Sequence, residues 1–181
     1  MAHRVQQDYI KSLRNKFRRH FIRKKVLEIG SLNINGTVRG FFRDCDFLGI
    51  DVGPGKDVDI ICEGQEYDAP NNTFDTVISC ECLEHNPYWL KTFINMHRMC
   101  KPGGLVIFTC ATTGRPEHGT ASHAPFASPL TIDKWDYYMN LTEANFTDSL
   151  FITDMFSEHE FSTVPRPYHD LQFYGVKKHN A

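Results

Sequence analysis

Short apolar runs, separated by polar and turn-forming residues, recur along most of the chain and predict β-strands. Each run is bounded by Gly, Pro, Asn or Asp, which is typical of strands in a globular domain. Five strands are predicted, at residues 26–30, 47–52, 57–61, 74–80 and 105–110. Further on, residues 151–161 and 171–177 predict a closing antiparallel pair.

Apolar residues with the spacing of a helix precede these runs and also occur between them. Apolar residues return every four positions near the start of the chain, and this stripe predicts an amphipathic helix that packs on the sheet. The stripe consists of Val5, Tyr9, Leu13, Phe17 and Phe21. Another helix is predicted in the connection between the first and second strands.

The stretch after the fourth strand predicts a longer helix. Asn86 can cap it with Pro87 at its first position, and Pro102-Gly103-Gly104 ends it. Its buried side is predicted to hold Trp89, Phe93, Ile94, Met96 and Met99.

The C-terminal third begins without any apolar pattern. Residues 111–130 are rich in Gly and Pro, and an unpatterned segment of this length in a compact domain is usually functional or disordered. Residues 131–140 and 142–150 then predict two short helices. Because Thr142 is followed at the third position by Asn145, the second of these helices lacks the acidic residue of a full capping box.

The first strand and the residues after it carry the most informative motif. Val26-Leu27-Glu28-Ile29-Gly30 is an apolar strand ending in glycine, Gly36 closes the loop that follows, and Asp51 ends the second strand. In a βαβ unit, such a loop lets a ligand approach the backbone, and the acid accepts bonds from ribose hydroxyls. The motif therefore predicts a ligand of the nucleotide type.

Two details distinguish this ligand from a dinucleotide. The loop has glycines only at its two ends, whereas a pyrophosphate needs the G-x-G-x-x-G spacing to sit against a helix N-terminus. Glu28 would also repel a pyrophosphate. Its carboxylate attracts instead a sulfonium ligand that carries an ammonium group.

The arrangement resembles motif I and the motif II acid of the Rossmann-like S-adenosylmethionine-dependent methyltransferases. The resemblance continues in the same order through residues 74–79, 83–85 and 101–107. Four motifs in register are far more specific than one. The resemblance implies an α/β fold with a seven-stranded, mostly parallel sheet, helices on both faces and an antiparallel terminal strand. The domain is expected over 26–181, after a basic helix at 1–25.

The resemblance also implies which residues hold S-adenosylmethionine. The methionyl end is expected at the first loop and beyond the fourth strand, the ribose after the second strand, and the adenine after the third. The implied residues are Glu28, Gly30, Ser31, Asn35, Gly36, Asp51, Val52, Glu63, Gly64, Cys80 and Glu81. Leu32 and Ile34 depart from the family's small residues, but Asn35-Gly36 can still form a turn because both residue types tolerate left-handed conformations.

Two histidines are candidates for the catalytic base. His118 lies in the long loop after the fifth strand, at the edge where open α/β sheets bind ligands. Methyl transfer to a hydroxyl needs a base that titrates near neutrality, and imidazole fits this need. His85 belongs to a motif of the resemblance in which such histidines often only anchor the loop, so it is the second candidate.

Two further segments bear on the acceptor. Residues 84–89 (E-H-N-P-Y-W) and 113–120 (T-G-R-P-E-H-G-T) resemble a subgroup of small methyltransferases that often accompany sugar-building enzymes. This resemblance favours O-methylation of a sugar or glycan hydroxyl by direct in-line transfer, without a metal ion.

Charge is distributed unevenly and supports an alternative. Residues 1–25 hold nine Lys or Arg against Asp8, a net charge of +8, which leaves −10 for the remainder. An RNA methyltransferase could use this helix, although a solvated face of a packed helix accounts for the same charges. A non-catalytic subunit that binds S-adenosylmethionine or a partner is the alternative from another class of protein.

Composition bounds the remaining possibilities. A chain of 181 residues suits one domain, and its apolar runs are far shorter than the ~20 residues that cross a bilayer. Because no apolar signal core is found at the N-terminus, a cytoplasmic location is expected. The six cysteines lack C-x-x-C spacing, which favours buried free thiols over a metal centre or disulfides.

Overall fold

The computed structural model describes residues 4–179, and their strands form one seven-stranded sheet with the order β3-β2-β1-β4-β5-β7-β6. The strands are β1 (Lys25–Ile29), β2 (Asp46–Asp51), β3 (Ile60–Ile61), β4 (Phe74–Cys80), β5 (Cys100–Ala111), β6 (Phe156–Val164) and β7 (Asp170–Lys177). The first five are parallel, and β7 is antiparallel to both of its neighbours. The predicted fold class is confirmed.

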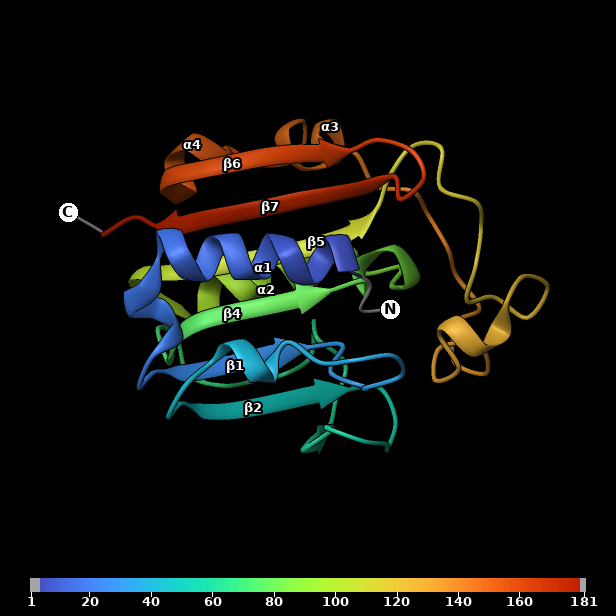
Figure 1. Ribbon diagram of the computed structural model, residues 1–181, viewed down its shortest axis with the longest axis horizontal. Coiled ribbons are helices and arrows are strands. Elements are labelled where there is room, and N and C mark those ends of the chain that lie inside the picture. Colours follow the sequence, from blue (N-terminus) through green and yellow to red (C-terminus); the bar gives the residue numbers. More distant parts are fainter. Residues whose placement is uncertain (1–3, 180–181) are drawn as a thin grey trace.

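The chain order of the strands reverses beside β1, because the chain first runs outward to β2 and β3 and then returns to β4 on the other side. In open α/β sheets, ligands bind at such a switch point, outside the carboxyl ends of the strands. In Figure 1 these ends lie on the right, where the loop between β5 and α3 (Glu143–Thr147) extends away from the sheet.

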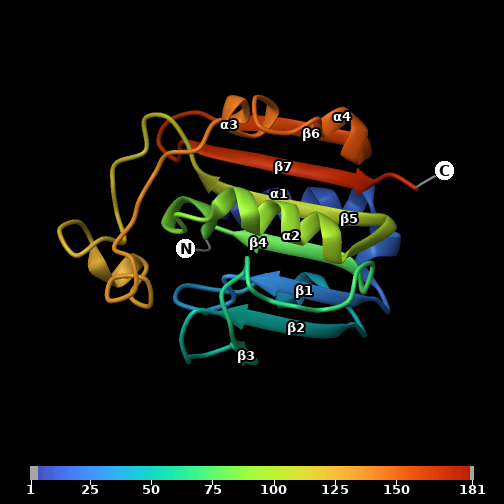
Figure 2. The same cartoon turned by 180° about the vertical axis from the view of Figure 1, so that it is seen from behind.

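Helices cover both faces of the sheet. Figure 1 shows α1 (Arg4–Lys16) in front, and Figure 2 shows α2 (Trp89–Met99) on the opposite face, where α3 and α4 (Ile152–Met155) also pack. Successive residues of β1 serve the two faces, since Val26 joins the core beneath α1 and Leu27 joins the core beneath α2. None of the helices within residues 4–179 has the length and apolar character that a bilayer crossing requires.

The N-terminal helix is shorter than predicted, and its buried side is rotated. α1 ends at Lys16 and is followed by a 3₁₀ turn, η1 (Arg18–Phe21). The buried residues of α1 are Gln6, Ile10 and Leu13, whereas Val5 is only half-buried. Residues four apart drift by about 40° per step around a 3.6-residue helix, so a stripe with strict four-residue spacing cannot stay on one face.

Two predicted helices are wrong. The connection between β1 and β2 contains only the short 3₁₀ helix η2 (Arg39–Phe41), and residues 131–140 form turns and irregular backbone. The loop up to Gly36 uses up much of the first connection, so little chain remains for a helix. A third predicted helix, at 142–150, is reduced to α3 (Glu143–Thr147), although Asn145 completes the capping box with Thr142 in place of an acid.

Smaller corrections concern element boundaries. α2 begins at Trp89, and the Asn86 side chain accepts a 2.8 Å hydrogen bond from the Tyr88 amide in the turn before it. Ile94 is 43% exposed rather than buried. β3 contains two residues instead of the predicted five, and β6 begins at Phe156 because α4 occupies the preceding residues.

Packing of α1 gives a stability prediction. Leu13 is 3% exposed, within the core between α1 and the sheet, so Leu13→Ala should lower the free energy of unfolding by about 2–5 kcal/mol through lost burial and a residual cavity. Urea denaturation followed by circular dichroism measures the change. Lys11→Ala, on the exposed side of the same helix, is the control, and an equal loss in that variant would contradict the packing of Leu13.

Candidate functional site

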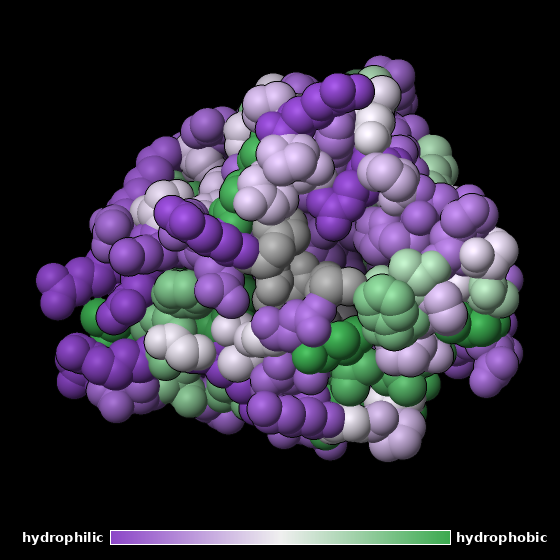
Figure 3. Space-filling model, turned by 45° about the vertical axis from the view of Figure 1, so that its right-hand side comes forward, coloured by the Kyte–Doolittle hydropathy of each residue, from purple (hydrophilic) through white to green (hydrophobic). Residues whose placement is uncertain are grey.

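Two adjoining cavities lie at the carboxyl ends of β1, β2 and β4, at the switch point of the sheet. Both are lined by Gly30, Asp51, Cys82, His85 and Thr131, and the two cavities together are called the cleft below. The first cavity extends toward α1, and the second extends toward β3 and Trp135. Figure 3 shows the side of the molecule on which this sheet edge faces the viewer, where the surface is mostly hydrophilic with local hydrophobic patches.

The loop after β1 approaches the cleft closely because of its first glycine. Gly30 has φ 78°, a left-handed conformation that disfavours side chains. A Cβ at this position would lie 2.5 Å from the Cβ of Cys82. The Gly30 and Ser31 amides both donate to the Ile50 carbonyl, which fixes the loop against β2, and both residues line the first cavity.

An asparagine holds the rest of this loop. Asn33 Oδ1 accepts a 2.9 Å bond from the Gly36 amide, and its Nδ2 donates to Asp57 at 2.7 Å. This pair of bonds accounts for a stable loop despite the large Leu32 and Ile34. Gly36 lines the first cavity, whereas the predicted Asn35 lines neither cavity.

Glu28 places a carboxyl group in the wall of the first cavity. It is 5% exposed, and its Oε2 is buried without a hydrogen-bond partner among the described residues. Burial raises its pKa from the ordinary 4.5 to about 8, although Arg39 opposes this shift. A cationic ligand group at this position would pair with the carboxylate.

This shift predicts a pH dependence of stability. The folded protein keeps a proton on Glu28 between about pH 4.5 and 8, where the unfolded chain has lost it, so stability falls as the pH rises through this window. Glu28→Gln should remove that loss, with a melting temperature on the order of 5 °C above wild type at pH 8 and little difference at pH 5. Differential scanning calorimetry measures it, with the exposed Glu143→Gln as control. Parallel curves for wild type and Glu28→Gln would contradict the shift.

Asp51 stands at the centre of the cleft, where it lines both cavities. Its Oδ2 accepts a 2.9 Å bond from the Leu32 amide and its Oδ1 a 2.7 Å bond from the Val52 amide. Burial raises the pKa of Asp51, and these two bonds oppose the shift. The carboxylate is thus fixed by the backbone, and each oxygen keeps a lone pair for a ligand.

The second cavity is bounded by residues at the ends of β2 and β3. Val52 and Gly64, both predicted to hold the cofactor, line it together with Cys62. Glu63 lines neither cavity, because its carboxylate forms a 2.6 Å ion pair with Lys134 and accepts a bond from Gln65. The acid predicted for this end of the cleft therefore lies beside it.

Beyond β4 the predicted residues Cys80 and Glu81 line the first cavity. Glu81 adopts a left-handed conformation, φ 50°, and accepts a 2.8 Å bond from the Thr109 hydroxyl of the neighbouring strand. Burial raises the pKa of Cys80, so its thiol remains protonated and acts as an apolar wall.

The two candidate histidines, His85 and His118, lie together. His85 lines both cavities, whereas His118 lines neither, but the two rings meet edge to face with centroids 5.0 Å apart. Burial lowers the pKa of His85 to about 3, helped by the neighbouring His118 ring, and burial also lowers the pKa of His118. Both rings are therefore neutral at pH 7. His118 does not line the cleft itself, and its contact with the cleft is through His85.

Two parts of the cleft were missed in the sequence. Gln6 of α1 and the segment 127–131 both line the first cavity. Gln6 is fully buried. Its position on the same helix face as Ile10 and Leu13 was the signal in the sequence that this polar side chain faces the interior. The segment 127–131 belongs partly to the stretch without apolar pattern.

Comparison with known proteins gives one family. A family model described as a methyltransferase domain matches residues 1–165 of the chain. No curated protein sequence matches the chain.

Solved structures share the fold. Phosphoethanolamine N-methyltransferase 2 of Haemonchus contortus, in complex with S-adenosyl-L-methionine, has a TM-score of 0.66 at 16% identity over 95% of this chain and 53% of that chain. This chain thus spans about half the length of that protein. The 1,6-didemethyltoxoflavin-N1-methyltransferase of Burkholderia thailandensis has a TM-score of 0.62 at 16% identity, covering 99% of this chain and 93% of that one. N-methyltransferase NodS of Bradyrhizobium japonicum WM9 has a TM-score of 0.62 at 14% identity, covering 96% and 97%.

Proposed function

Since this chain belongs to the methyltransferase domain family, we propose that it binds S-adenosylmethionine in the cleft and transfers the methyl group to a hydroxyl of a sugar or glycan. The observation that carries the cofactor assignment is the placement of two acids in one cleft, the buried Glu28 and the partly buried Asp51. Glu28 lines the first cavity and Asp51 lines both, and acids so placed suit the cationic amino acid end and the ribose of such a ligand. The solved relatives crystallised with S-adenosylmethionine or S-adenosylhomocysteine support the same cofactor.

Each part of the cofactor has a proposed partner. The Glu28 carboxylate pairs with the ammonium group, beside Gly30, Ser31 and the end of the loop at Gly36. Asp51 accepts from both ribose hydroxyls, as acids at this strand end do in related folds. The adenine ring occupies the second cavity between Val52 and Gly64.

Four further residues have less direct roles. Glu63 is assigned to the adenine amino group, and it must exchange its ion pair with Lys134 to reach it. Cys80 and Glu81 bound the methionine side of the first cavity. Asn35 contributes through the turn that closes the loop.

The proposed transfer is a direct displacement. The acceptor oxygen attacks the methyl carbon, the carbon–sulfur bond breaks, and S-adenosylhomocysteine leaves with the electron pair of that bond. The hydroxyl proton passes to a neutral histidine, for which we propose His118 first and His85 second. The neutral ring of His118 has one nitrogen bonded to the Pro116 carbonyl, so its other nitrogen can accept a proton.

An assay with radiolabelled S-adenosylmethionine tests this proposal. Purified protein is incubated separately with sugar nucleotides, oligosaccharides, small amines and total RNA, and labelled products are identified by mass spectrometry. The proposal expects label in a methyl ether on a sugar. Label only in amines, as the names of the solved N-methyltransferases suggest for those proteins, would replace the hydroxyl acceptor. Binding of S-adenosylhomocysteine without transfer to any pool would indicate a non-catalytic subunit.

The basic helix distinguishes sugar from RNA. Gln6, near the start of α1, lines the cleft. Arg14 lies about 12 Å farther along the helix axis, and Arg18 and Arg19 follow it in the chain. Replacing all three with Gln should leave the melting temperature and transfer to a neutral sugar nearly unchanged. Lys16 is retained because it pairs with Glu158 at 2.8 Å. A large loss of transfer that parallels a loss of salt-sensitive RNA binding would favour the RNA alternative.

A further inference from the structure

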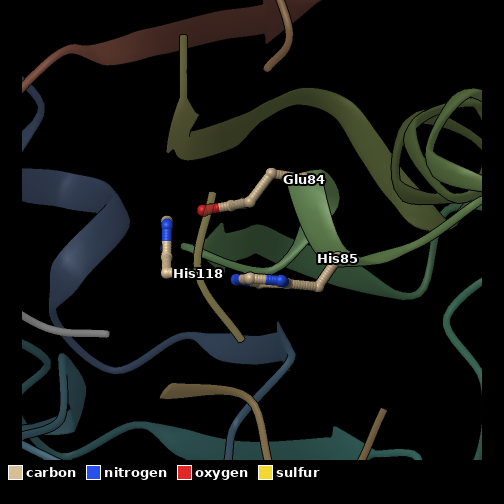
Figure 4. A group of neighbouring side chains, drawn as sticks. All are labelled: Glu84, His85 and His118. Atoms are coloured by element: carbon tan, nitrogen blue, oxygen red, sulfur yellow. The ribbon is translucent and has the colours of Figure 1, made fainter. Parts of the chain in front are cut away.

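We propose that Glu84, His85 and His118 form a binding site for one divalent transition-metal ion, with Zn²⁺ as the best-matched ion. The three side chains come from the turn after β4 and from the loop after β5. Figure 4 shows the Glu84 carboxyl group and one end of the His85 ring both directed toward His118. The cysteine spacing predicts no metal centre, and this site contains no cysteine.

The geometry is close to that of a bound ion. One ligand atom from each of the three residues lies within 4.8 Å of the others, so some point is within about 2.8 Å of all three. Zinc is bound at about 2.0–2.2 Å by imidazole nitrogen and carboxylate oxygen. Each donor therefore has to move inward by only about 0.7 Å, which side-chain torsions can supply.

Two of the three residues are buried, and each has one buried polar atom without a hydrogen-bond partner. Glu84 Oε2 and His85 Nδ1 have no hydrogen-bond partner among the described residues, and their side chains are 0% and 3% exposed. Buried polar atoms without a partner are rare and costly. A cation beside the buried Glu84 carboxyl group would supply the partner that Oε2 lacks.

The outer contacts orient the donors as metal sites require. His118 Nδ1 lies 3.0 Å from the Pro116 carbonyl oxygen, which can only accept, so Nδ1 carries the proton and Nε2 keeps the lone pair. Glu84 Oε1 accepts a 3.2 Å bond from the Ala111 amide, which leaves Oε2 to the ion. Backbone carbonyls on the second imidazole nitrogen and hydrogen bonds to the ligating carboxylate are characteristic of metal ligands.

The donor set selects the metal. Two imidazoles and one carboxylate suit Zn²⁺ and other late first-row ions, whereas Mg²⁺ and Ca²⁺ prefer oxygen ligands alone. Three protein ligands also leave one coordination position open, as in zinc sites that bind water or a small ligand. His118 is only partly buried, so an ion can enter from the loop side.

Binding of the ion does not depend on the proposed reaction, but its consequence for transfer does. An ion on His118 Nε2 occupies the lone pair that the proposed base uses. If the methyl transfer proceeds as proposed, the Zn²⁺-loaded protein should therefore transfer more slowly than the metal-free protein. Metal binding and base catalysis are then alternative states of one cluster.

The test titrates ZnCl₂ into the full-length chain after treatment with a chelator, using isothermal titration calorimetry and elemental analysis of the dialysed protein. One equivalent of zinc is expected in wild type. His118→Ala and Glu84→Gln should each weaken binding at least roughly 100-fold, because loss of even an outer partner of a ligand costs 10–100-fold. His123→Ala is the matched control, since His123 lies in the same loop with a 61% exposed side chain.

Several outcomes would overturn the site. These are no retained zinc in wild type, or equal weakening by His118→Ala and His123→Ala. Co²⁺ in place of Zn²⁺ reports the ligands, and a thiolate-to-cobalt charge-transfer band would assign the ion to cysteine instead. His118 lies in a loop, so its variant keeps the test decisive if Glu84→Gln fails to fold. Calorimetry with S-adenosylhomocysteine on the same samples shows separately whether the cofactor proposal fails.

Discussion

Asp51→Ala is expected to weaken binding of S-adenosylhomocysteine at least tenfold while the fold survives. The carboxylate lines both cavities and is proposed to accept from two ribose hydroxyls. Hydrogen bonds to a charged group are worth about 1.5–3 kcal/mol each, so losing both sets an upper limit of roughly 10²–10⁴ in affinity. Isothermal titration calorimetry measures the dissociation constant, and circular dichroism checks the fold.

A second consequence of this substitution needs its own control. Asp51 also accepts the Leu32 and Val52 amides, so its removal loosens the loop after β1. Asp51→Asn keeps the size of the side chain and one acceptor oxygen, and it should bind with intermediate affinity. Asp46→Ala, at the exposed opposite end of β2, should bind like wild type. Wild-type affinity in a folded Asp51→Ala protein would remove the ribose assignment.

The strands were predictable because their burial pattern is local. A parallel strand covered on both faces needs a continuous apolar run, as in residues 26–29, and such runs are visible without any knowledge of the fold. The edge strand is the exception. In β3, Ile60 and Ile61 are 39% and 59% exposed, and only these two residues pair with β2. The apolar run at this position therefore predicted a longer strand than the one that forms.

The helices were less predictable, because tertiary contacts decide where they form. The connection after β1 contains Phe41 and Phe42, which pack against the core beneath α1. Its only helical element is the short η2. At residues 131–135, the Thr131 carbonyl accepts the amides of Trp135 and Asp136, and the Trp135 indole donates to the His85 carbonyl at 2.7 Å. The segment therefore makes a single turn of helical bonding at Thr131, and the contact of Trp135 with His85 holds it against the cleft.

The site was predictable where it follows strand ends and not where distant segments meet. Glu28 and Asp51 end neighbouring parallel strands, and such ends share one edge of the sheet. The meeting of Glu84 and His85 with His118 depends on how a loop without any periodic pattern folds back to the turn after β4, and no local signal in the sequence predicts this. The ion pair that holds Glu63 against Lys134 is a contact of the same kind.

His118→Ala is expected to lower turnover with a hydroxyl acceptor by roughly 10²–10⁴, the range typical of a lost general base. His118 lines neither cavity of the cleft, so the affinity for S-adenosylhomocysteine should stay within about twofold of wild type. This separation of turnover from cofactor binding is the signature of a group on the acceptor side. Single-turnover kinetics measure the transfer step, with a chelator present so that metal occupancy does not contribute to the loss.

The neighbourhood of His118 supplies the controls for this result. His123→Ala removes a histidine from the same loop without touching the His85–His118 pair, and it should retain nearly full turnover. Tyr138 packs on the His118 ring with centroids 4.9 Å apart. Tyr138→Phe keeps this aromatic ring and removes only its hydroxyl, so it tests whether ring packing alone orients His118. This variant should also retain most activity. Turnover of His118→Ala within a few-fold of wild type would assign the residue to loop structure. The base would then be sought at His85, which lines the cleft directly.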